Sequence, residues 1–141
     1  MPFRGNFEYA LDDRGRVAIP AKYRDEFPKD KAVITPSPEG CLRVFPEAAF
    51  QQMSDDFAAT PATTPEGRRL RRLFDGRAYD VELDRQGRIL IPAPLRTQAG
   101  LNGAVVLAGN RECLEIWDPE AYEREMQDAE LASSVGQRPE E

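Results

Sequence analysis

The chain has 141 residues, of which 40% are hydrophobic and 31% charged, a balance typical of a soluble globular protein rather than a disordered or membrane-spanning one. It contains no histidine, which excludes Ser-His-Asp and Cys-His catalysis and removes the commonest transition-metal ligand. Its two cysteines, Cys41 and Cys113, are too few for a four-cysteine zinc site, and we expect both thiols to be reduced and buried. The composition therefore predicts a protein that is not an enzyme and has no metal, other cofactor or small-molecule substrate.

The formal net charge is −6, from 19 basic and 25 acidic residues, which looks unsuited to a nucleic-acid partner. The acidic excess lies at one end, because residues 118–141 contain eight acidic residues and two arginines. Residues 1–117 are therefore neutral overall, and basic residues can gather on one face of that part. No apolar stretch is long enough for a membrane span or a signal peptide, so we expect a cytoplasmic protein without a membrane partner.

The chain contains an internal repeat. The segment 11–24, LDDRGRVAIPAKYR, returns as 83–96, LDRQGRILIPAPLR, with an offset of 72 at every position. The same offset aligns 41–45 with 113–117, so the repeated unit is about 45 residues long. Because a unit of that size buries too little surface to fold securely alone, we expect the two copies to pair into one core.

The first copy predicts the following elements in chain order: a strand at 7–11, a tight turn at 12–15, a strand at 16–19, a helix at 20–27, a hairpin of 32–35 and 41–45, and a helix at 46–57. The turn is expected to form the tip of a hairpin between its flanking strands. A loop at 58–65 then leads into a linker helix at 66–74, which has apolar residues on one side.

The second copy predicts the same series: a strand at 79–83, a turn at 84–87, a strand at 88–91, a helix at 92–99, a hairpin of 104–107 and 113–117, and a helix at 119–131. The repeated aromatic residues near the second hairpins are expected to pack in the core. The domain organisation follows: repeat 1 at 7–53, a linker with a basic helix at 58–76, repeat 2 at 79–125, and an acidic flexible tail at 132–141.

The two turns carry the strongest candidate for a functional site. Their Asp-x-x-Gly-Arg pattern is expected to be capped by the aspartates and to need glycine for a positive φ; these turn residues are Asp12, Gly15, Asp84 and Gly87. An arginine fork matches phosphate oxygens or the edge of guanine, and a hairpin fits the major groove of duplex DNA. The candidate DNA-contacting residues are Arg14, Arg16, Arg24, Arg85, Arg88 and Arg96.

Two alternatives remain open for these basic residues. The arginines that follow the turns could instead form local salt bridges with Asp12 and Asp84, and the spacing alone does not decide between the two roles. A second basic cluster, at 68–72 in the linker helix, has four arginines in five residues. Such a cluster is more often a solvated face or an interface than a DNA contact.

These residues resemble the bacterial MraZ family over residues 3 to about 125. The similarity is carried by the FRG start at 3–5 and by two Asp-x-x-x-Arg motifs, at 12–16 and 84–88, each followed by Ile-Pro and a helical arginine. The resemblance implies an α+β, mainly β fold in which two pseudo-symmetric AbrB-like swapped-hairpin units form one β-barrel-like core with short flanking helices.

The resemblance also implies a function. MraZ-like proteins are transcriptional regulators of the cell-division and cell-wall gene cluster, including their own promoter. They form rings that present their Asp-x-x-x-Arg turns to repeated promoter boxes. On this basis Arg16 and Arg88 are expected to contact double-stranded promoter DNA, helped by Arg14 and Arg85, and the protein is expected to be a nucleoid-associated repressor.

A rival hypothesis is an AbrB-like antitoxin or another protein-interaction module. Such antitoxins usually carry one copy of the unit and a disordered tail that binds the toxin, whereas this chain carries two copies and a short tail. An enzyme is a more distant alternative, because the chain has neither histidine nor a set of metal ligands.

Overall fold

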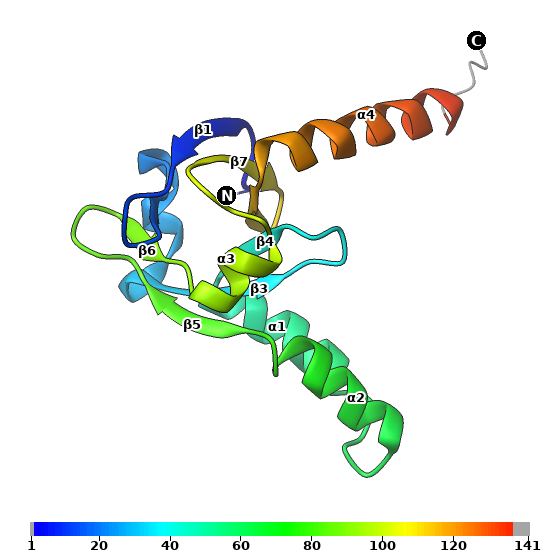
Figure 1. Ribbon diagram of the computed structural model, residues 1–141. Helices are drawn as coiled ribbons and strands as arrows, with labels where there is room; N and C mark the ends of the chain where they lie inside the picture. Colours follow the sequence, from blue (N-terminus) through cyan, green and yellow to red (C-terminus); the bar gives the residue numbers. More distant parts are fainter. Residues whose placement is uncertain (1, 137–141) are drawn as a thin grey trace.

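The computed structural model describes residues 2–136, with side chains described as far as residue 133, and its elements follow the two repeats along the chain (Figure 1). Repeat 1 contains β1 (Asn6–Ala10), β2 (Arg16–Ala18), the 3₁₀ helices η1 (Ala21–Glu26) and η2 (Pro28–Asp30), β3 (Lys31–Pro36), β4 (Leu42–Pro46) and α1 (Glu47–Phe57). The linker contains α2 (Pro65–Phe74). Repeat 2 contains β5 (Tyr79–Glu82), β6 (Arg88–Leu90), α3 (Ala93–Gln98), β7 (Ala104–Asn110), β8 (Cys113–Trp117) and α4 (Pro119–Gly136).

Six of these strands form one antiparallel sheet in the order β1-β7-β8-β4-β3-β5. Each outer strand pairs with the hairpin of the other repeat, β1 with β7 and β5 with β3. At the centre β4 pairs with β8, which places Arg43 opposite Glu115, its counterpart in the second repeat. The predicted pairing of the two copies into one body is therefore confirmed, and it is achieved by exchange of strands.

The strands that follow the two turns form a separate ribbon, in which β2 pairs with β6 and Val17 lies opposite Ile89. The expectation that each turn joins two paired strands of its own repeat is wrong. Each turn instead carries the chain from the six-stranded sheet into the ribbon, because strand exchange gives β2 a partner from the other repeat. The turn still closes locally, since Gly15 N donates to Asp12 O at 3.0 Å.

The main core joins the ribbon to the sheet and takes side chains from both repeats. Ile19 and its counterpart Ile91 are fully buried in it, as are Leu42 and its counterpart Leu114. Both flanks of the ribbon are thereby tied to the same apolar interior, so the turns at its ends are held on a rigid base. The strand ladder does not close into a barrel: β1 and β5 remain the edge strands of the described sheet.

The predicted helices are present with small shifts, and that at 20–27 is the 3₁₀ helix η1. The last helix, α4, continues to Gly136, so residues 132–136 are helical and not the flexible tail that the sequence predicts there. This extension follows from residues 129–132, Ala-Glu-Leu-Ala, which favour a helix. The rest of that predicted tail, 137–141, lies outside the described residues.

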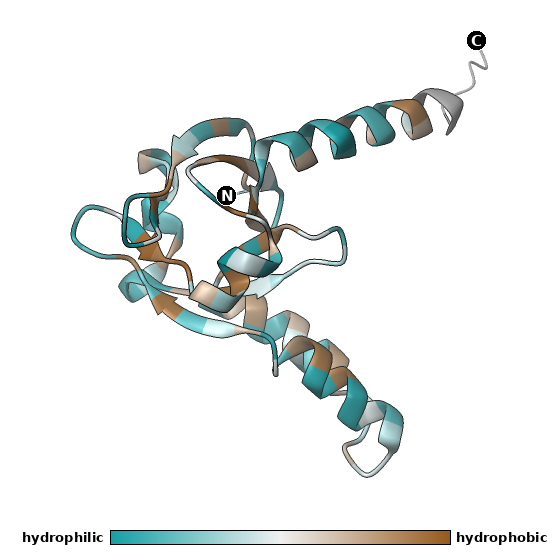
Figure 2. Cartoon of the chain, viewed as in Figure 1, coloured by the Kyte–Doolittle hydropathy of each residue, from teal (hydrophilic) through white to brown (hydrophobic). Residues whose placement is uncertain are grey.

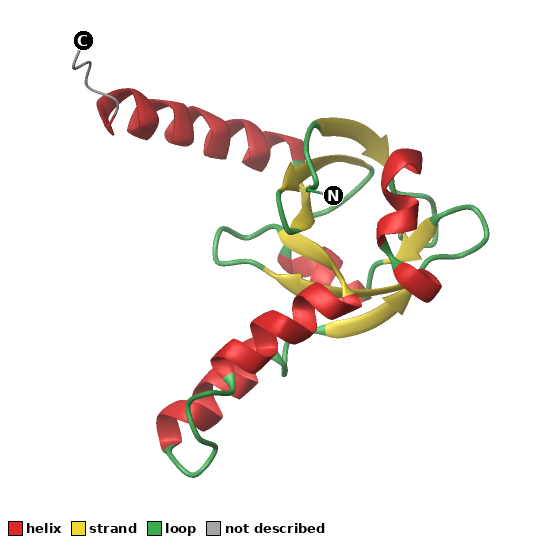
Figure 3. Cartoon of the chain, turned by 180° about the vertical axis from the view of Figure 1, so that it is seen from behind, coloured by secondary structure: helices red, strands yellow, loops and turns green. Residues whose placement is uncertain are grey.

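Two helical parts project from the β core on the side away from the turns (Figure 3). One is α4, which is mostly hydrophilic along its length (Figure 2). The other is the pair α1–α2, which is held together by stacked rings of Phe57 and Phe74 with centroids 3.6 Å apart. Ser54 Oγ donates to Asp75 Oδ1 at 2.8 Å across the same pair. No helix in the described part of the chain is long and apolar enough to cross a membrane.

Candidate nucleic-acid interface

The first turn is organised by the carboxylate of Asp12. Its Oδ1 accepts from the backbone N–H groups of Arg14 and Arg16, each at 2.9 Å. Its Oδ2 accepts from Arg16 Nε at 2.6 Å. The predicted capping role of Asp12 is confirmed, and the same carboxylate also fixes the direction of the guanidinium group that follows the turn.

The second turn repeats this arrangement. Asp84 Oδ1 accepts from the backbone N–H groups of Gln86 and Arg88 at 2.9 Å, and Asp84 Oδ2 accepts from Arg88 Nε at 2.9 Å. The capping role predicted for Asp84 is therefore confirmed as well. The same set of hydrogen bonds is therefore present in both copies. In each, one aspartate caps the turn backbone and orients the side chain of one arginine.

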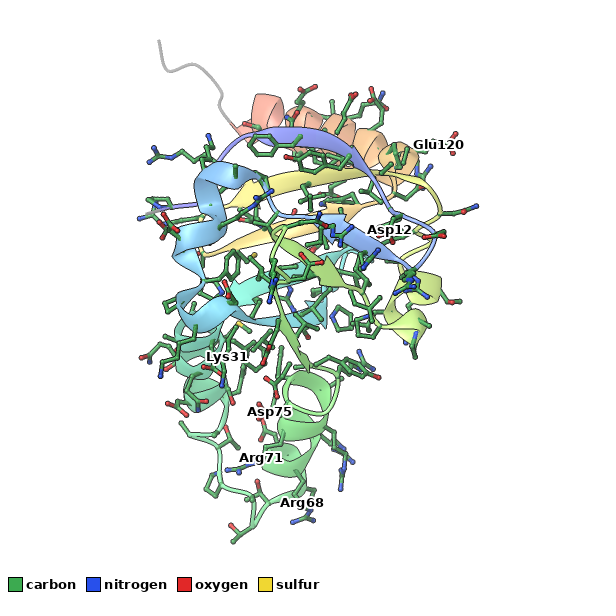
Figure 4. The ribbon with its side chains drawn as sticks, turned by 90° about the vertical axis from the view of Figure 1, so that its left-hand side faces the viewer. Asp12, Lys31, Arg68, Arg71, Asp75 and Glu120 are labelled. Atoms are coloured by element: carbon green, nitrogen blue, oxygen red, sulfur yellow. The ribbon has the colours of Figure 1, made fainter. Side chains whose placement is uncertain are left out.

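The two turns lie at opposite ends of the ribbon. Because the ribbon is only three residues long, the turns are next to each other (Figure 1). Ile19 N donates to Gly87 O at 2.8 Å, and Ile91 N donates to Gly15 O at 3.0 Å, so each turn is bonded to the strand end of the other repeat. Arg88 Nη1 also lies 3.8 Å from Asp12 Oδ2, across the ribbon. Both turns are on the face that contains Asp12 in Figure 4.

Two helical arginines support the turns from beneath. Arg96 Nη1 donates to Ile91 O at 2.6 Å, and its guanidinium group lies where a Cβ on Gly15 would point. Arg24 Nε donates to Ile19 O at 3.1 Å, and its guanidinium group lies in the corresponding place beside Gly87. Each arginine therefore supports the turn of the other repeat, a position that sequence spacing could not reveal.

The turn glycines are required for two separate reasons. Gly15 and Gly87 have φ values of 84° and 75°, in the left-handed region that side chains disfavour. Both are also buried, and a Cβ on either would overlap the guanidinium group beneath it. The predicted need for glycine at these positions is confirmed, and the close approach of an arginine adds a reason beyond φ.

The arginines beside the turns combine ion pairing with exposure. The side chains of Arg16 and Arg88 are 27% and 29% exposed, and each uses Nε for the bond to its aspartate. Arg14 and Arg85 are exposed on the turns themselves. The turns contain three aspartates, Asp12, Asp13 and Asp84, against the six candidate arginines. This region therefore has a local excess of three positive charges, although the protein as a whole is acidic. Both roles weighed for Arg16 and Arg88 are thus compatible with this geometry.

The carboxylates of the turns are held in their charged form. Hydrogen bonds from the Arg16 backbone and side chain lower the pKa of Asp12 to about 2, against a smaller opposing effect of burial. The pKa of Asp84 is also lowered, chiefly by the backbone N–H of Arg88. At neutral pH each aspartate therefore holds its arginine by a charge-assisted bond.

The ribbon contains one exposed apolar residue that sequence analysis did not single out. Leu90 is 54% exposed and lies opposite Arg16 in the ribbon register. Its counterpart Ala18 lies opposite Arg88. The run Ile89-Leu90-Ile91 conceals this exposure, since an unbroken apolar run does not show which residue faces outward; only the repeat alignment with Ala18 hints at it.

The other candidates lie away from the turns. Cys41 and Cys113 are buried free thiols, as predicted, and burial raises the pKa of each to about 12, which suppresses their reactivity. No group of three or more metal-ligating side chains occurs in the part of the chain that the structure describes. The linker arginines lie on α2, where Arg68 and Arg71 are seen well below Asp12 (Figure 4).

Comparison with known proteins agrees with the duplication. Residues 2–73 and 74–138 each match the family described as "MraZ protein, putative antitoxin-like". The chain is 44% identical over 130 residues to the transcriptional regulator MraZ of Nitrosomonas europaea, covering 90% of this chain and 88% of that protein. It is 38% identical to the protein of the same name from Thermomicrobium roseum, covering 95% and 92%, and 44% identical to that from Thermus thermophilus, covering 86% and 85%.

Proposed function

The chain belongs to the MraZ family of transcriptional regulators, and we propose that it is a sequence-specific DNA-binding repressor of the cell-division and cell-wall gene cluster, including its own promoter. It acts in the cytoplasm, on the nucleoid, as a ring of identical subunits bound to repeated promoter boxes. It performs no catalysis. The observation that carries the proposal is the placement of two Asp-x-x-x-Arg turns side by side on one exposed face.

In the proposed complex the ribbon and its two turns enter the major groove, which is wide enough for a two-stranded β element. Arg16 and Arg88 donate from their Nη atoms to phosphates or guanine edges while Nε stays bonded to the turn aspartate. Arg14 and Arg85 add phosphate contacts from the exposed turns. Arg24 and Arg96, first considered as DNA contacts, are assigned a positioning role because they support the opposite turn.

A single subunit offers few cations, so its affinity for one box is expected to be low. A ring repeats the same two turns on each subunit and can bind several boxes at once. The second and later contacts are then intramolecular, which raises the overall affinity by roughly 10²–10⁴. Occupation of boxes beside the promoter excludes RNA polymerase and represses transcription.

The proposal is tested by an electrophoretic shift assay with the DNA immediately upstream of this protein's own coding sequence. We expect retarded complexes that require at least two boxes, and loss of the shift in Arg16→Ala with Arg88→Ala. Arg111→Ala is the matched control, because Arg111 is an exposed arginine between β7 and β8, outside the ribbon and its two turns. Unchanged binding by the double variant, with a fold intact by circular dichroism, would reject the turns as the DNA contacts.

The antitoxin-like wording of the family description supports one second candidate, a protein-interaction module. Its partner would be a toxin-like protein bound in place of, or together with, DNA. Co-purification with the tagged chain from its own host distinguishes the two candidates. A stoichiometric toxin-like partner supports the interaction module, and the absence of such a partner argues against it and favours the regulator.

A further inference from the structure

An acidic groove lies where α4 leaves the sheet. It has a volume of ≈390 Å³ and includes Trp117, Tyr122 and Met126 together with the carboxylates of Glu39, Glu115 and Glu125. Glu115 is satisfied within the chain, since it accepts from Asn110 Nδ2 at 2.7 Å and from Trp117 Nε1 at 2.9 Å. Among the described residues, the carboxylates of Glu39 and Glu125 have neither a hydrogen bond nor an ion pair, so the groove combines aromatic side chains with uncompensated negative charge.

A surface of opposite character lies on α2. Arg69, Arg72 and Leu73 are spaced to share one helix face, and all three are exposed, Leu73 to 44%. The other two arginines of the cluster are used within the chain, since Arg71 Nη2 donates to Ala58 O and Arg68 Nη1 donates to Ala62 O. The Arg69–Arg72–Leu73 face is thus left basic, partly apolar and without a partner among the described residues.

The helix beside the groove also exposes apolar side chains in the part of its outer half that the structure describes. Met126 and Leu131 are 40% and 67% exposed, and α4 extends away from the core into solvent (Figure 1). Isolated helices of this length are marginal in water, so a helix that projects in this way gains stability when a second surface packs against it.

We propose that the Arg69–Arg72–Leu73 face of one copy binds the acidic groove beneath α4 of the next copy. Leu73 covers the exposed part of Met126 and the aromatic side chains, while the two guanidinium groups pair with Glu39 and Glu125. The inference deepens the assembly of identical subunits proposed above and rests on it.

The position of the two surfaces favours a second copy as the occupant. In Figure 4 the labelled arginines of α2 lie at one end of the molecule and Glu120, at the start of α4, lies at the other, with Asp12 between them. A contact between two different surfaces of the same chain repeats from copy to copy and closes into a ring when the rotation permits. It would also leave the turns uncovered on every copy.

The test uses two charge-reversed variants of the full chain, Arg69→Glu with Arg72→Glu, and Glu39→Arg with Glu125→Arg. The control is Lys29→Glu with Lys31→Glu, which reverses two exposed lysines outside both surfaces. Mass is measured by light scattering after size-exclusion chromatography. We expect each variant alone to shift to monomer, with at least a tenfold rise in the dissociation constant, roughly the effect of opposing like charges at an interface, while the control assembles as the wild type does.

The decisive step is to mix the two variants. The acidic α2 of the first fits the basic groove of the second, and the unchanged α2 of the second fits the unchanged groove of the first. We therefore expect the equimolar mixture to recover the assembled mass with the copies alternating, which a general loss of stability in either variant could not produce.

The remaining outcomes separate this inference from the proposed function. If the wild type assembles and both variants assemble equally well, the interface is overturned while the proposed regulator stands. If Arg69→Glu with Arg72→Glu keeps its mass but loses DNA affinity, the α2 face contacts DNA and the interface is again overturned. A wild type that is monomeric at all concentrations overturns both the ring and this contact, whereas its DNA binding is judged by the shift assay.

Discussion

The two turns have the same backbone but different charge. The Asp12 carboxylate is ion-paired with Arg16 at 2.6 Å and with Arg88 at 3.8 Å, whereas the Asp84 carboxylate is ion-paired with Arg88 alone among the described residues. Residues 12–16 are neutral, because Asp13 offsets one arginine, whereas residues 84–88 have a net charge of +1. The duplication therefore preserved the residues that shape the turn, whereas the charge of the turn diverged between the two copies.

This difference predicts unequal roles for the two repeats in DNA binding. The first turn is the more strongly held one, since its aspartate attracts two guanidinium groups. The second turn combines a net positive charge with the more exposed of the two aspartates. We expect the second turn to make the stronger phosphate contact. The first turn should chiefly fix the position of the ribbon along the DNA.

The largest expected effect is on DNA affinity. Arg88→Ala should weaken binding to box-containing duplex by about 1–3 kcal/mol, and Arg16→Ala should weaken it by less within the same range. Fluorescence anisotropy at several salt concentrations measures both, and the salt slope should fall by about one for each phosphate contact removed. Arg88→Lys, which keeps the charge without the planar fork, should restore only part of the affinity. A larger effect of Arg16→Ala would reverse the assignment of the two turns.

The next effect is on stability, where the two turns should behave alike because both glycines have the same surroundings. Gly15→Ala and Gly87→Ala should each lower the free energy of unfolding by about 1–2 kcal/mol for the positive φ, with more lost by displacing the arginine beneath. Gly40→Ala is the control, because Gly40 also has a positive φ of 97° but no other residue within 4 Å of the place that the alanine methyl group would take. Urea unfolding should place Gly40→Ala closest to the wild type. Equal losses in all three would show that the arginine contacts contribute nothing.

The sequence predicted those features that are local or that the repeat makes redundant. The capped turns at Asp12 and Asp84 followed from residue type alone, and the pairing of the copies followed from their size. Strand exchange at β2 was implied only by the resemblance to swapped-hairpin units, since a strand of three residues does not itself specify which of two equivalent partners it pairs with.

The same limit applies to the positions of Arg24 and Arg96 beneath the turns. Arg24 and Arg96 recur at equal spacing after each turn, so the sequence groups them with Arg16 and Arg88 as one basic set. In the folded chain strand exchange brings each beneath the opposite turn, a relation that depends on the fold and leaves no trace in spacing. The extent of α4 was also missed, because the polar composition of its second half obscured residues that favour a helix.

A smaller effect should follow from exchanging the charges of the two turns. Asp13→Arg with Arg14→Gln gives the first turn the side chains of the second, and Arg85→Asp with Gln86→Arg does the reverse. We expect the first exchange to strengthen DNA binding a few-fold, roughly the effect of adding cations at an exposed site, and the second to weaken it similarly. Both changes leave the aspartate caps intact, so thermal midpoints should stay near that of the wild type. If neither exchange alters affinity, the charge difference between the turns has no part in binding.

The smallest effect concerns the stability of the fold at acidic pH, to which the carboxylate of Asp12 contributes. Because the pKa of Asp12 is lowered to about 2 in the folded protein, its bonds contribute stability that is present above the ordinary pKa of an aspartate, about 4, and is lost as pH falls from there toward 2. Asp12→Asn removes the charge at every pH, so its thermal midpoint should fall less steeply than that of the wild type over this interval. Asp84→Asn should also flatten the profile, but by less if sharing between two arginines is what holds Asp12 so strongly in its charged form. Equal flattening in the two variants would mean that Arg88 contributes nothing to Asp12 across the ribbon, and that the turns are electrostatically independent despite their shared base.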